Sequence, residues 1–374
     1  MEKCRVLELI GGSLTDGGAE TLVKDYVLNI DKSRFETAVF VDWKIPETAN
    51  TRILTDNGQL IYTSYPRYSL FWRGINKFFR KSFLVRGIRK AIKDFNPDVI
   101  HVHLDALSYI CNLKSDIRGR KLFYTCHSTV EAMLEENEKE FHAAQDLVKN
   151  NGLRFIALHQ QMADELNQKF GVTDTAIVNN GINLERFKSV DESRDEIRSD
   201  LGVPIDSFVV GHVGRFSEEK NHKMIIEIFK KVKERQKKAF LLLVGDGQLR
   251  TDIEEKLKEY ELGNSTLILS HRTDIPRLLK AMDVFLLPSL YEGFPVSLIE
   301  ALCAGKRCVV SKNVPEEAFV SDLVIPIDIS ESIDNWVDAV LDGKRRSSYQ
   351  NRLDEYDIKT TVRRLEKIYL GEIQ

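Results

Sequence analysis

The sequence predicts an α/β protein built from two doubly wound domains with parallel sheets, and three observations support this fold class. Short, wholly apolar runs alternate with longer amphipathic stretches, and this alternation occurs twice along the chain. Apolar strands that alternate with helices are typical of parallel sheets covered on both faces. The length of 374 residues exceeds the size at which a single core usually divides. A hydrophobic fraction of 43% is enough to fill two cores, which argues against global disorder.

The expected strands are the short apolar runs. In the first half of the chain they are 5–10, 37–41, 99–102, 122–125, 155–158 and 176–178. In the second half they are 208–213, 240–244, 266–269, 284–287 and 308–310. A helix is expected between successive strands, because apolar side chains recur there at helical spacing. The example after strand 208–213 has its apolar stripe at Met224, Ile225, Ile228, Phe229 and Val232.

A polar, turn-rich stretch separates the two series of strands and predicts the domain boundary. We expect a first domain at 1–182, a second domain at 183–355 and a terminal helix at 356–374. No short-period repeat or low-complexity tract interrupts either series.

Charge, cysteine content and the apolar runs exclude several classes of protein. The net charge of −3 argues against a generic nucleic-acid binder. Five scattered cysteines without a CxxC pair favour neither a disulfide framework nor a zinc knuckle. The N-terminus MEKCRVLELI lacks the features of a signal peptide, and no apolar run reaches the roughly twenty residues that span a membrane. We therefore expect a cytoplasmic protein in a reducing compartment.

The first candidate binding loop follows strand 5–10 and contains Gly11, Gly12, Gly17 and Gly18. In doubly wound sheets, ligands bind beyond the carboxyl ends of the strands. Glycine lets the backbone approach a ligand closely, and a helix that begins near Gly18 would offer free N–H groups to an anion. The spacing matches neither GxGxxG nor a Walker loop. A flexible connection without a ligand stays the alternative.

Two cations follow the first strand of the second domain. Strand 208–213 is followed by Gly214 and Arg215, and Lys220 lies where the next helix is expected to begin. Arginine offers a bidentate fork and lysine a point charge, a combination that suits a pyrophosphate. The alternative is a pair of solvated surface cations.

A helix is expected to open at Pro295, directly after a Gly-Phe turn. Proline suits the first turn of a helix, because its missing N–H would have no partner there. The free N–H groups of the next residues would then form an anion site. These residues are Val296, Ser297 and Leu298.

Two glutamates bracket this anion position. Glu300 lies about 7.5 Å beyond Pro295 along the helix axis, where it could accept hydrogen bonds from a vicinal diol such as a ribose. Glu292 precedes the turn and could bind sugar hydroxyls. Either glutamate taken alone could equally be a solvated acid at a helix end.

Three histidines follow or end apolar strands of the first domain. His127 follows strand 122–125, and His101 and His103 form a His-x-His pair. Alternate residues of a strand share a face, so this pair could bind a metal only with further ligands. No third ligand is evident in the sequence, so no metal site is expected. The chain also lacks an Asp-x-Asp pair, the simplest carboxylate clamp for a metal-bound nucleotide sugar.

Several of these stretches together resemble family GT4 of the retaining glycosyltransferases. Glu292 to Glu300 forms the E-x7-E pattern of that family. The matching stretches are PSLYEGFPVSLIEALCAGKRCVVS, GRFSEEKN, LLLVGDG and NNGIN. The resemblance is dense over 179–311 and looser before it, where GGSLTDGGAE, HVH and TCHST carry it. The most similar subgroup builds bacterial capsule, exopolysaccharide and lipopolysaccharide glycans.

The resemblance implies the GT-B fold, in which two Rossmann-like domains face each other across a cleft. The terminal helix at 356–374 would return to the first domain. The implied reaction is retaining transfer of a glycosyl group from a nucleotide-diphosphate sugar, with UDP favoured, to a saccharide or lipid-linked acceptor. No cofactor and no metal ion are implied. The alternatives are a GT-B relative such as an epimerase, and a non-catalytic sugar-nucleotide-binding partner of another transferase.

The resemblance also implies roles for residues of the second domain. Arg215 and Lys220 would hold the diphosphate beside Gly214, and Glu300 would bind the ribose. Glu292 would bind hydroxyls of the donor sugar. The implied mechanism is front-face substitution, in which the leaving phosphate takes the acceptor proton. The two cations and the helix terminus would stabilise the charge on that phosphate in place of a metal ion.

The remaining implied positions lie around the donor. Gly17 and Gly18 would close over the phosphate from the first domain, and His127 would lie near the anomeric carbon. Arg272 would lie near the base. The turn residues that would pack against the donor sugar are Gly293, Phe294 and Pro295.

One basic and aromatic stretch suggests contact with a membrane. Residues 65–93 contain nine Lys or Arg residues and no acidic residue. Aromatic and aliphatic side chains recur there at helical spacing, a pattern typical of a helix that lies in a bilayer interface. They are Phe71, Trp72, Ile75, Phe78, Phe79 and Phe83. We expect peripheral contact with the inner face of the plasma membrane through 65–83, with burial of this apolar stripe in the domain core as the alternative.

Overall fold

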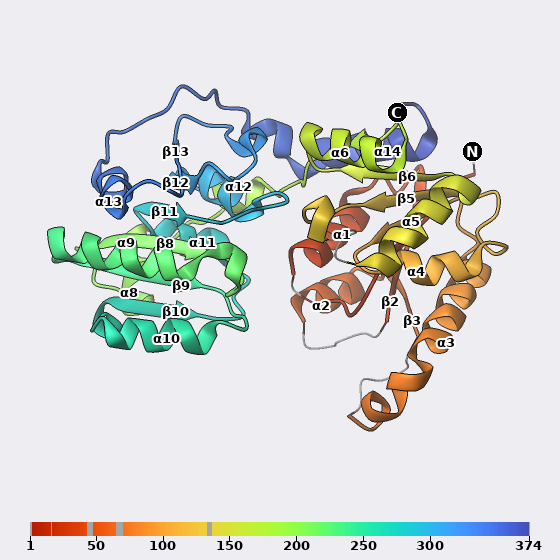
Figure 1. Cartoon of the computed structure of the whole chain (residues 1–374), viewed down its shortest axis with the longest axis horizontal. Helices are drawn as coiled ribbons and strands as arrows, with labels where there is room; N and C mark the ends of the chain where they lie inside the picture. The colour runs from red at the N-terminus through yellow and green to blue at the C-terminus, as the bar shows by residue number, and fades with distance from the viewer. Residues whose placement is uncertain (1, 16, 43–47, 65–69, 133–136, 374) are drawn as a thin grey trace. The chain divides into compact units, whose positions relative to one another are not determined.

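The computed structural model describes residues 2–15, 17–42, 48–64, 70–132 and 137–373, and for 70–80 it describes the backbone alone. It divides into two compact units (Figure 1). The first unit comprises Met1–Gly181 and Ile358–Gln374, and the second comprises Ile182–Asp357. The chain thus changes units after residues 181 and 357, where the sequence analysis placed boundaries after 182 and 355.

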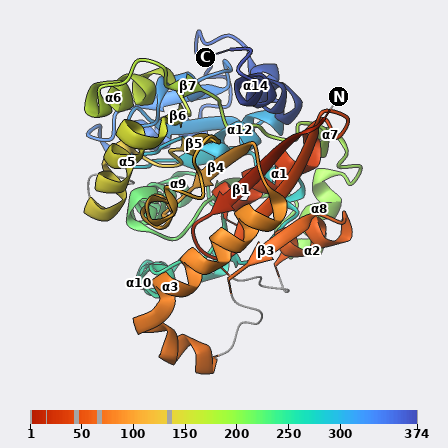
Figure 2. The ribbon, with the colours of Figure 1, turned by 90° about the vertical axis from the view of Figure 1, so that its right-hand side faces the viewer.

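A seven-stranded parallel sheet forms the centre of the first unit, with the order β3-β2-β1-β4-β5-β6-β7. Its strands are β1 (Cys4–Ile10), β2 (Phe35–Val41), β3 (Leu60–Thr63), β4 (Val99–His103), β5 (Lys121–Thr125), β6 (Leu153–Ala157) and β7 (Ala176–Ile177). Its helices are α1 (Gly18–Asn29), α2 (Ala49–Asp56), α3 (Leu70–Phe95), α4 (Leu107–Ile110), α5 (Glu138–Asn151), α6 (Gln160–Phe170) and α14 (Ile358–Leu370). Figure 2 shows the same ribbon turned by 90°.

A six-stranded parallel sheet forms the centre of the second unit, with the order β10-β9-β8-β11-β12-β13. Its strands are β8 (Phe208–Val213), β9 (Ala239–Val244), β10 (Thr266–Leu269), β11 (Val284–Leu287), β12 (Arg307–Ser311) and β13 (Val324–Ile327). Its helices are α7 (Glu185–Lys188), α8 (Arg194–Leu201), α9 (His222–Arg235), α10 (Arg250–Glu259), α11 (Ile275–Ala281), α12 (Val296–Cys303) and α13 (Ile333–Leu341). Two parallel sheets flanked by helices confirm the predicted α/β class.

Two edge strands were missed by the sequence analysis. β3 is half-exposed along most of its length, and its apolar run, residues 60–62, is only three residues long. β13 contains Pro326, and proline within a run argues against a central strand. Both strands lie at the edge of their sheet, where half-exposed residues and a missing N–H are tolerated.

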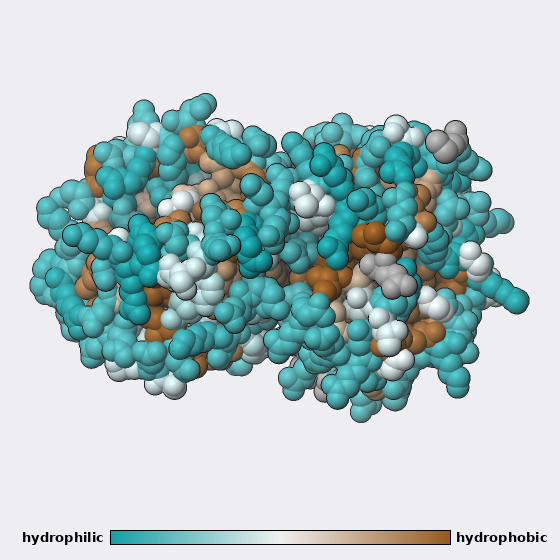
Figure 3. Space-filling view, turned by 90° about the horizontal axis from the view of Figure 1, so that it is seen from above, coloured by the Kyte–Doolittle hydropathy of each residue, from teal (hydrophilic) through white to brown (hydrophobic). Residues whose placement is uncertain are grey.

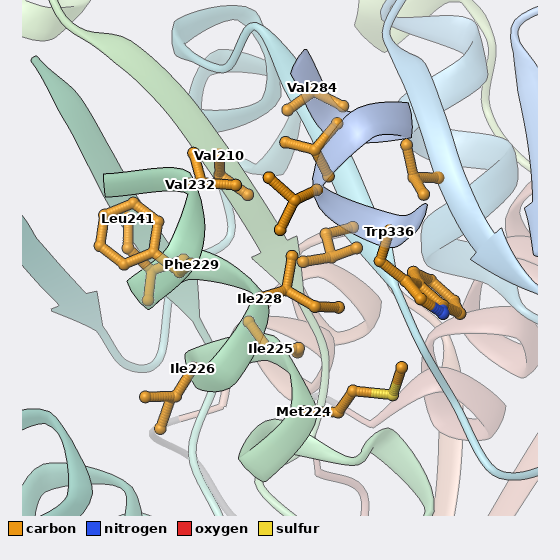
Figure 4. Close-up of a cluster of buried hydrophobic side chains, with 14 of the residues drawn as sticks. Val210, Met224, Ile225, Ile226, Ile228, Phe229, Val232, Leu241, Val284 and Trp336 are labelled. Atoms are coloured by element: carbon orange, nitrogen blue, oxygen red, sulfur yellow. The ribbon is translucent and has the colours of Figure 1, made fainter. Parts of the chain in front are cut away.

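The core of the second unit lies between its sheet and helices α9 and α13. The predicted apolar stripe of α9 is buried, and Trp336 of α13 is fully buried beside it (Figure 4). Burying one such side chain contributes about 1.5–3 kcal/mol. Burial of the predicted face therefore explains why this segment folds as a helix on the sheet.

The C-terminal helix α14 packs in the first unit, as the sequence analysis expected. Its apolar face shares a buried cluster with residues of β1, β4 and β5. Members of that cluster include Val6, Val99, Phe123, Val362, Leu365 and Tyr369. The last helix of the chain is thus part of the core of the first unit.

Helix α3 combines a buried end with a beginning that extends beyond the sheet (Figure 1 and Figure 2). Ile88, Ile92 and Phe95 are buried, as expected for core packing. The stretch proposed to meet a membrane, 65–83, falls largely outside the described side chains, because 65–69 are not described and 70–80 are described as backbone alone. Membrane contact through this stretch therefore stays a prediction.

A helix that spans a membrane must be both long and apolar. Among the helices in the part of the chain described here, none is long and apolar enough to cross a bilayer. On the face shown in Figure 3, hydrophilic residues cover most of the surface and hydrophobic residues are scattered between them.

Candidate active site

The order of strands in the second sheet marks one position for a ligand. The chain progresses outward from β8 through β9 to β10, then returns to β11 on the other side of β8. The loops after β8 and β11 therefore diverge at a topological switch point, where doubly wound sheets bind ligands. These two loops contain the cations and the first glutamate that the sequence analysis singled out.

Lys220 and Glu292 form an ion pair at this switch point. The Lys220 Nζ donates to Glu292 Oε1 at 2.6 Å and to Oε2 at 2.8 Å. Ser289 Oγ donates to the same carboxylate at 2.7 Å. The two charged side chains are only 15% and 7% exposed, so solvent screens their attraction weakly. The structure thus joins two residues that the sequence analysis had assigned to different parts of the donor.

Backbone contacts hold the two loops together. The Leu290 N–H donates to the Glu219 carbonyl at 2.8 Å, and the Asn221 side chain donates to the Pro288 carbonyl at 3.2 Å. Asn221 has a φ of 54°, a left-handed conformation that asparagine adopts more readily than most residues. These contacts fix the backbone on both sides of the Lys220–Glu292 pair.

Glycine is required where this loop meets its neighbours. A Cβ on Gly214 would lie 2.8 Å from His212 Nε2, beneath the loop. A Cβ on Gly245, which follows β9, would lie 1.9 Å from the Gly214 carbonyl oxygen. Close backbone packing therefore accounts for glycine at both positions.

Arg215 differs from Lys220 in its surroundings. Its side chain is exposed, and among the described residues no hydrogen bond or ion pair engages its guanidinium. The structure therefore brings Lys220, but not Arg215, into contact with Glu292.

The start of α12 differs from the sequence expectation. Pro295 is the residue before the helix rather than its first residue. The Val296 N–H donates to the Phe294 carbonyl at 3.0 Å, and the Leu298 N–H donates to the Pro295 carbonyl at 3.0 Å. Two of the three N–H groups expected to be free are therefore engaged within a tight turn. The N–H of Ser297 has no partner among the described residues.

The turn residues and the second glutamate lie close to this helix start. Phe294 is 7% exposed and stacks on Tyr356, with ring centroids 5.3 Å apart. Its ring therefore packs inside the unit against Tyr356, and its predicted contact with the donor sugar stays a prediction. Gly293 and Pro295 are also buried, whereas Glu300 is half-buried within α12.

Arg272 is engaged by a neighbouring carboxylate. Its Nε donates to Asp274 Oδ1 at 2.7 Å, and a second nitrogen contacts Oδ2. The hydrogen bond to Asp274 raises the pKa of Arg272, and the reciprocal bond lowers the pKa of Asp274. Arg272 follows β10, two strands from β8, and it does not contact Lys220 or Glu292.

The glycine loop of the first unit ends at the start of α1. Gly17 is the residue before the helix, and Gly18 is its first residue. Glu20 lies in the first turn, and Thr15 Oγ1 donates to its carboxylate at 2.7 Å. A carboxylate is favourable at a helix N-terminus, so an approaching phosphate would meet a negative charge already there.

His127 belongs to a buried polar network that the sequence analysis did not foresee. His127 Nε2 and His103 Nδ1 are 2.8 Å apart, and His103 Nε2 lies 2.8 Å from Glu8 Oε2. Glu8, His101 and His103 present ligand atoms that all lie within 4.8 Å of one another. The expectation that the His-x-His pair has no third neighbour of this kind is therefore wrong. The available signal was Glu8 itself, a single carboxylate inside the apolar strand VLELI.

Two family models match the chain, one over most of each unit. Residues 16–186 match the model described as Glycosyltransferase Family 4. Residues 193–360 match the model described as Glycosyl transferases group 1. Together they cover nearly the whole sequence.

Curated relatives match over similar spans. The chain is 29% identical over 372 residues to the putative glycosyltransferase EpsF of Bacillus subtilis (strain 168), covering 96% of this chain and 92% of that protein. It is 26% identical over 304 residues to the UDP-Gal:alpha-D-GlcNAc-diphosphoundecaprenol alpha-1,3-galactosyltransferase of Escherichia coli, covering 77% and 79% of the two chains.

Solved structures share the fold at low sequence identity. Anabaena Alr3699/HepE in complex with UDP and glucose has a TM-score of 0.79 at 19% identity, covering 98% of this chain and 99% of that chain. WaaG, a glycosyltransferase involved in lipopolysaccharide biosynthesis, has a TM-score of 0.70 at 12% identity, covering 97% and 95%. This likeness confirms the two-domain fold that the sequence analysis expected.

Proposed function

The chain belongs to the GT4-type glycosyltransferases with the GT-B fold, and from this premise we propose its donor, stereochemistry and acceptor. Its relatives are bacterial glycosyltransferases, and it acts in the synthesis of a polysaccharide or a lipid-linked saccharide. The proposed reaction is metal-independent transfer of a glycosyl group from a UDP-sugar, with retention of configuration, to a lipid-linked saccharide.

The Lys220–Glu292 pair at the switch point is the observation that carries this proposal. A largely buried ammonium that is paired with a carboxylate can exchange that partner for a phosphate, which is also negatively charged. The exchange would release Glu292, whose carboxylate could then accept hydrogen bonds from sugar hydroxyls. One ion pair would thus supply both the diphosphate contact and the sugar contact.

The exposed Arg215 and the Ser297 N–H would complete the charge stabilisation. Negative charge builds on the diphosphate as the glycosyl bond breaks, so donors fixed at that position bind the transition state more tightly than the ground state. In the proposed front-face reaction, the leaving phosphate accepts the proton of the acceptor hydroxyl. The sequence contains no Asp-x-Asp pair for a metal-bound diphosphate, and Lys220 and Arg215 would take that role.

The names of the relatives support the choice of donor and acceptor. The Escherichia coli relative is named for UDP-Gal and for a diphosphoundecaprenol-linked acceptor. A Campylobacter jejuni relative, 23% identical over 377 residues, is likewise named for transfer to a diphospho-undecaprenol saccharide. A lipid-linked acceptor would also give a function to the basic, aromatic stretch 65–83, which we propose contacts the membrane surface.

A transfer assay tests the proposal. The purified protein would be incubated in excess EDTA with a panel of UDP- and GDP-sugars and a short-chain undecaprenyl-diphosphate saccharide, and NMR of the product would give its anomeric configuration. We expect product from a UDP-sugar with the donor's configuration. An inverted product would contradict retention, and activity that returns only with Mg²⁺ or Mn²⁺ would contradict metal independence. A protein that binds the donor without hydrolysis or transfer would favour the non-catalytic alternative.

A further inference from the structure

Three strands bring four polar side chains to one face of the first sheet. Glu8 of β1 lies opposite His101 of β4, and His103 of β4 lies opposite Thr125 of β5. His127 follows Thr125 by two residues, which in an extended chain returns it to the same face. Glu8, His101 and His103 are each at most 1% exposed, whereas His127 is half-buried. The network therefore runs from the core of the unit toward its surface.

The side chains form a continuous chain of short contacts. Glu8 Oε2 lies 2.8 Å from His103 Nε2, and His103 Nδ1 lies 2.8 Å from His127 Nε2. Among the described residues, Nδ1 of His127 has no hydrogen-bond partner, and it is not one of the buried unpaired atoms. Since Nε2 of this half-buried ring is engaged by a buried residue, the part of the ring open to a ligand carries Nδ1.

The second oxygen of Glu8 is held by the C-terminal helix. The Tyr369 hydroxyl of α14 donates to Glu8 Oε1 at 3.0 Å and lies 2.6 Å from His101 Nδ1. His101 Nε2 in turn lies 2.7 Å from Thr125 Oγ1. Glu8 is thus fixed from two sides and cannot rotate away from His103 without breaking other buried hydrogen bonds, each of which is costly to leave unmade.

The protonation states of the two rings follow from their surroundings. Burial opposes the ionised form of Glu8, but the charge that His101 and His103 carry when protonated, together with hydrogen bonds from both rings, outweighs it and keeps the pKa of Glu8 below its usual range. Burial, together with the charge of His101, lowers the pKa of His103 to about 4. Burial and the neighbouring histidines also lower the pKa of His127 well below its ordinary value. At neutral pH, Glu8 is therefore a carboxylate and both rings are neutral.

The positions of the protons then follow by elimination. A carboxylate only accepts hydrogen bonds, so His103 must carry its proton on Nε2. Its Nδ1 is then an acceptor, so His127 must carry its own proton on Nε2. The Nδ1 of His127 is left with a bare lone pair.

We infer that Glu8 and His103 are positioning residues that lock His127 in the Nε2–H tautomer, so that its Nδ1 accepts a hydrogen bond from a hydroxyl of the bound sugar or acceptor. This inference rests on the proposed function for the presence of a substrate at His127. Without Glu8, His103 could reverse its tautomer, and His127 would then present a donor where a hydroxyl donor is expected. Removing the partner that orients a functional imidazole at metal sites typically lowers activity by about 10–100-fold, and we expect a loss of that order here.

The same residues match the spacing of a bound zinc ion at one pair of atoms and depart from it at another. His101 Nδ1 lies 3.3 Å from Glu8 Oε2, whereas His103 Nε2 lies 2.8 Å from the same oxygen. Nitrogen and oxygen ligands lie about 2.0–2.1 Å from zinc, which puts tetrahedral ligand atoms about 3.3 Å apart. The His103–Glu8 contact at 2.8 Å and the Tyr369–His101 contact at 2.6 Å are shorter and are typical of hydrogen bonds. The geometry therefore favours a proton, not a metal ion, between these atoms.

Nitrogen NMR of the histidine rings tests the tautomers without any substrate. The full-length protein would be labelled with ¹⁵N-histidine, and the signals of His103 and His127 would be assigned from single His→Gln variants. We expect both rings at pH 7 to show a protonated Nε2 and an unprotonated Nδ1. A protonated Nδ1 on His127, or averaging between tautomers, would overturn the inference. Stoichiometric zinc in protein purified without chelator would also overturn it.

Kinetics of matched variants test the functional part. Glu8→Gln removes the charge that fixes His103, and Glu366→Gln is the control, because Glu366 is another buried glutamate of the first unit. Glu366 accepts from the Asp31 N–H at 2.7 Å, and among the described residues no hydrogen bond joins it to the histidines. We expect kcat to fall about 10–100-fold in Glu8→Gln, with a disturbed His127 tautomer, and to change less than about twofold in Glu366→Gln.

The outcomes separate this inference from the proposed function. Unchanged kcat in a folded Glu8→Gln protein, with the parent active, overturns the inference and leaves the proposed function standing. A parent protein that shows the expected tautomers but transfers no sugar contradicts the proposed function instead. If Glu8→Gln does not fold, the ring signals of the parent protein still decide the tautomer. Tyr369→Phe then replaces it in the kinetic comparison, because it removes the hydroxyl that contacts Glu8 Oε1 and His101 Nδ1 but keeps the Glu8–His103 contact, and a smaller loss is expected.

Discussion

Replacing Glu292 by glutamine should lower the stability of the folded protein and at the same time strengthen its binding of UDP. In the parent protein, Lys220 Nζ lies 2.6 Å and 2.8 Å from the two carboxylate oxygens, and both side chains are largely buried. At an effective dielectric of about 20, unit charges about 4 Å apart attract by about 4 kcal/mol, which sets the order of magnitude of what a phosphate must replace. Glutamine keeps the shape of the side chain but removes this competitor for Lys220.

The magnitudes follow from what remains around Lys220. Ser289 and the new amide compensate only part of the lost charge, so we expect the free energy of unfolding to fall by about 1–3 kcal/mol. If UDP gains about 1–2 kcal/mol from the freed ammonium, its Kd should fall about 5- to 30-fold. Turnover with the UDP-sugar should nevertheless fall at least about tenfold, because an amide accepts hydrogen bonds from sugar hydroxyls less strongly than a carboxylate.

Titration calorimetry with UDP at low and high salt would measure the affinity, and thermal unfolding without ligand would measure the stability. Glu218→Gln is the matched control, because it removes the same charge from an exposed position of the loop that contains Lys220. We expect the UDP affinity of that variant to change less than about twofold. If UDP binds Glu292→Gln no more tightly than the parent protein does, then Lys220 does not exchange Glu292 for the diphosphate, and the reasoning is wrong.

Three further outcomes are expected. Lys220→Ala should lower kcat by about 10²–10³, with a smaller change in the Kd of UDP, because the diphosphate gains charge in the transition state; equal losses in both would show that Lys220 only binds the donor. The pKa of His103 is about 4 in the folded protein, below the ordinary histidine value of 6.5. Between these two pH values the unfolded chain binds more protons than the folded chain. The free energy of unfolding should therefore fall as pH drops through this window, by up to about 1.4 kcal/mol per pH unit. Urea unfolding at several pH values would measure how the free energy of unfolding changes with pH. If a His103→Gln variant showed the same pH dependence, His103 would not be its cause. Co-sedimentation with anionic vesicles should decrease as salt rises, because salt screens the basic residues of 65–83; no binding at low salt would exclude the membrane contact.

Repeating sequence patterns were sufficient to predict the fold class and the central strands, but not the strands at the edges of the two sheets. The central strands are continuous apolar runs, because both faces of a parallel sheet are buried, and the stripe of α9 has a clear helical period. β3 and β13 give a weaker signal, since the apolar run of β3 is short and half-exposed and that of β13 is interrupted by Pro326. The local pattern predicts a strand only where burial dictates the choice of residues.

The loops at the switch point could be predicted from the sequence, whereas the contacts between them could not. Lys220 and Glu292 are 72 positions apart, and their ion pair depends on β8 and β11 being neighbours in the sheet. Glu8 and His103 are likewise joined by the pairing of β1 with β4. The expectation of free N–H groups at Val296 and Leu298 was wrong, because the short turn before α12 engages both.

The most direct test of the account is whether the purified protein, in excess EDTA, transfers sugar from a UDP-sugar to an undecaprenyl-diphosphate saccharide. Mass spectrometry would detect the added residue, and the proton coupling constant of its anomeric centre would report the configuration. We expect a product with the donor's configuration from the parent protein, and about 10²–10³-fold less product per unit time from Lys220→Ala. No transfer from any UDP-sugar, or equal rates for the two proteins, would contradict this expectation.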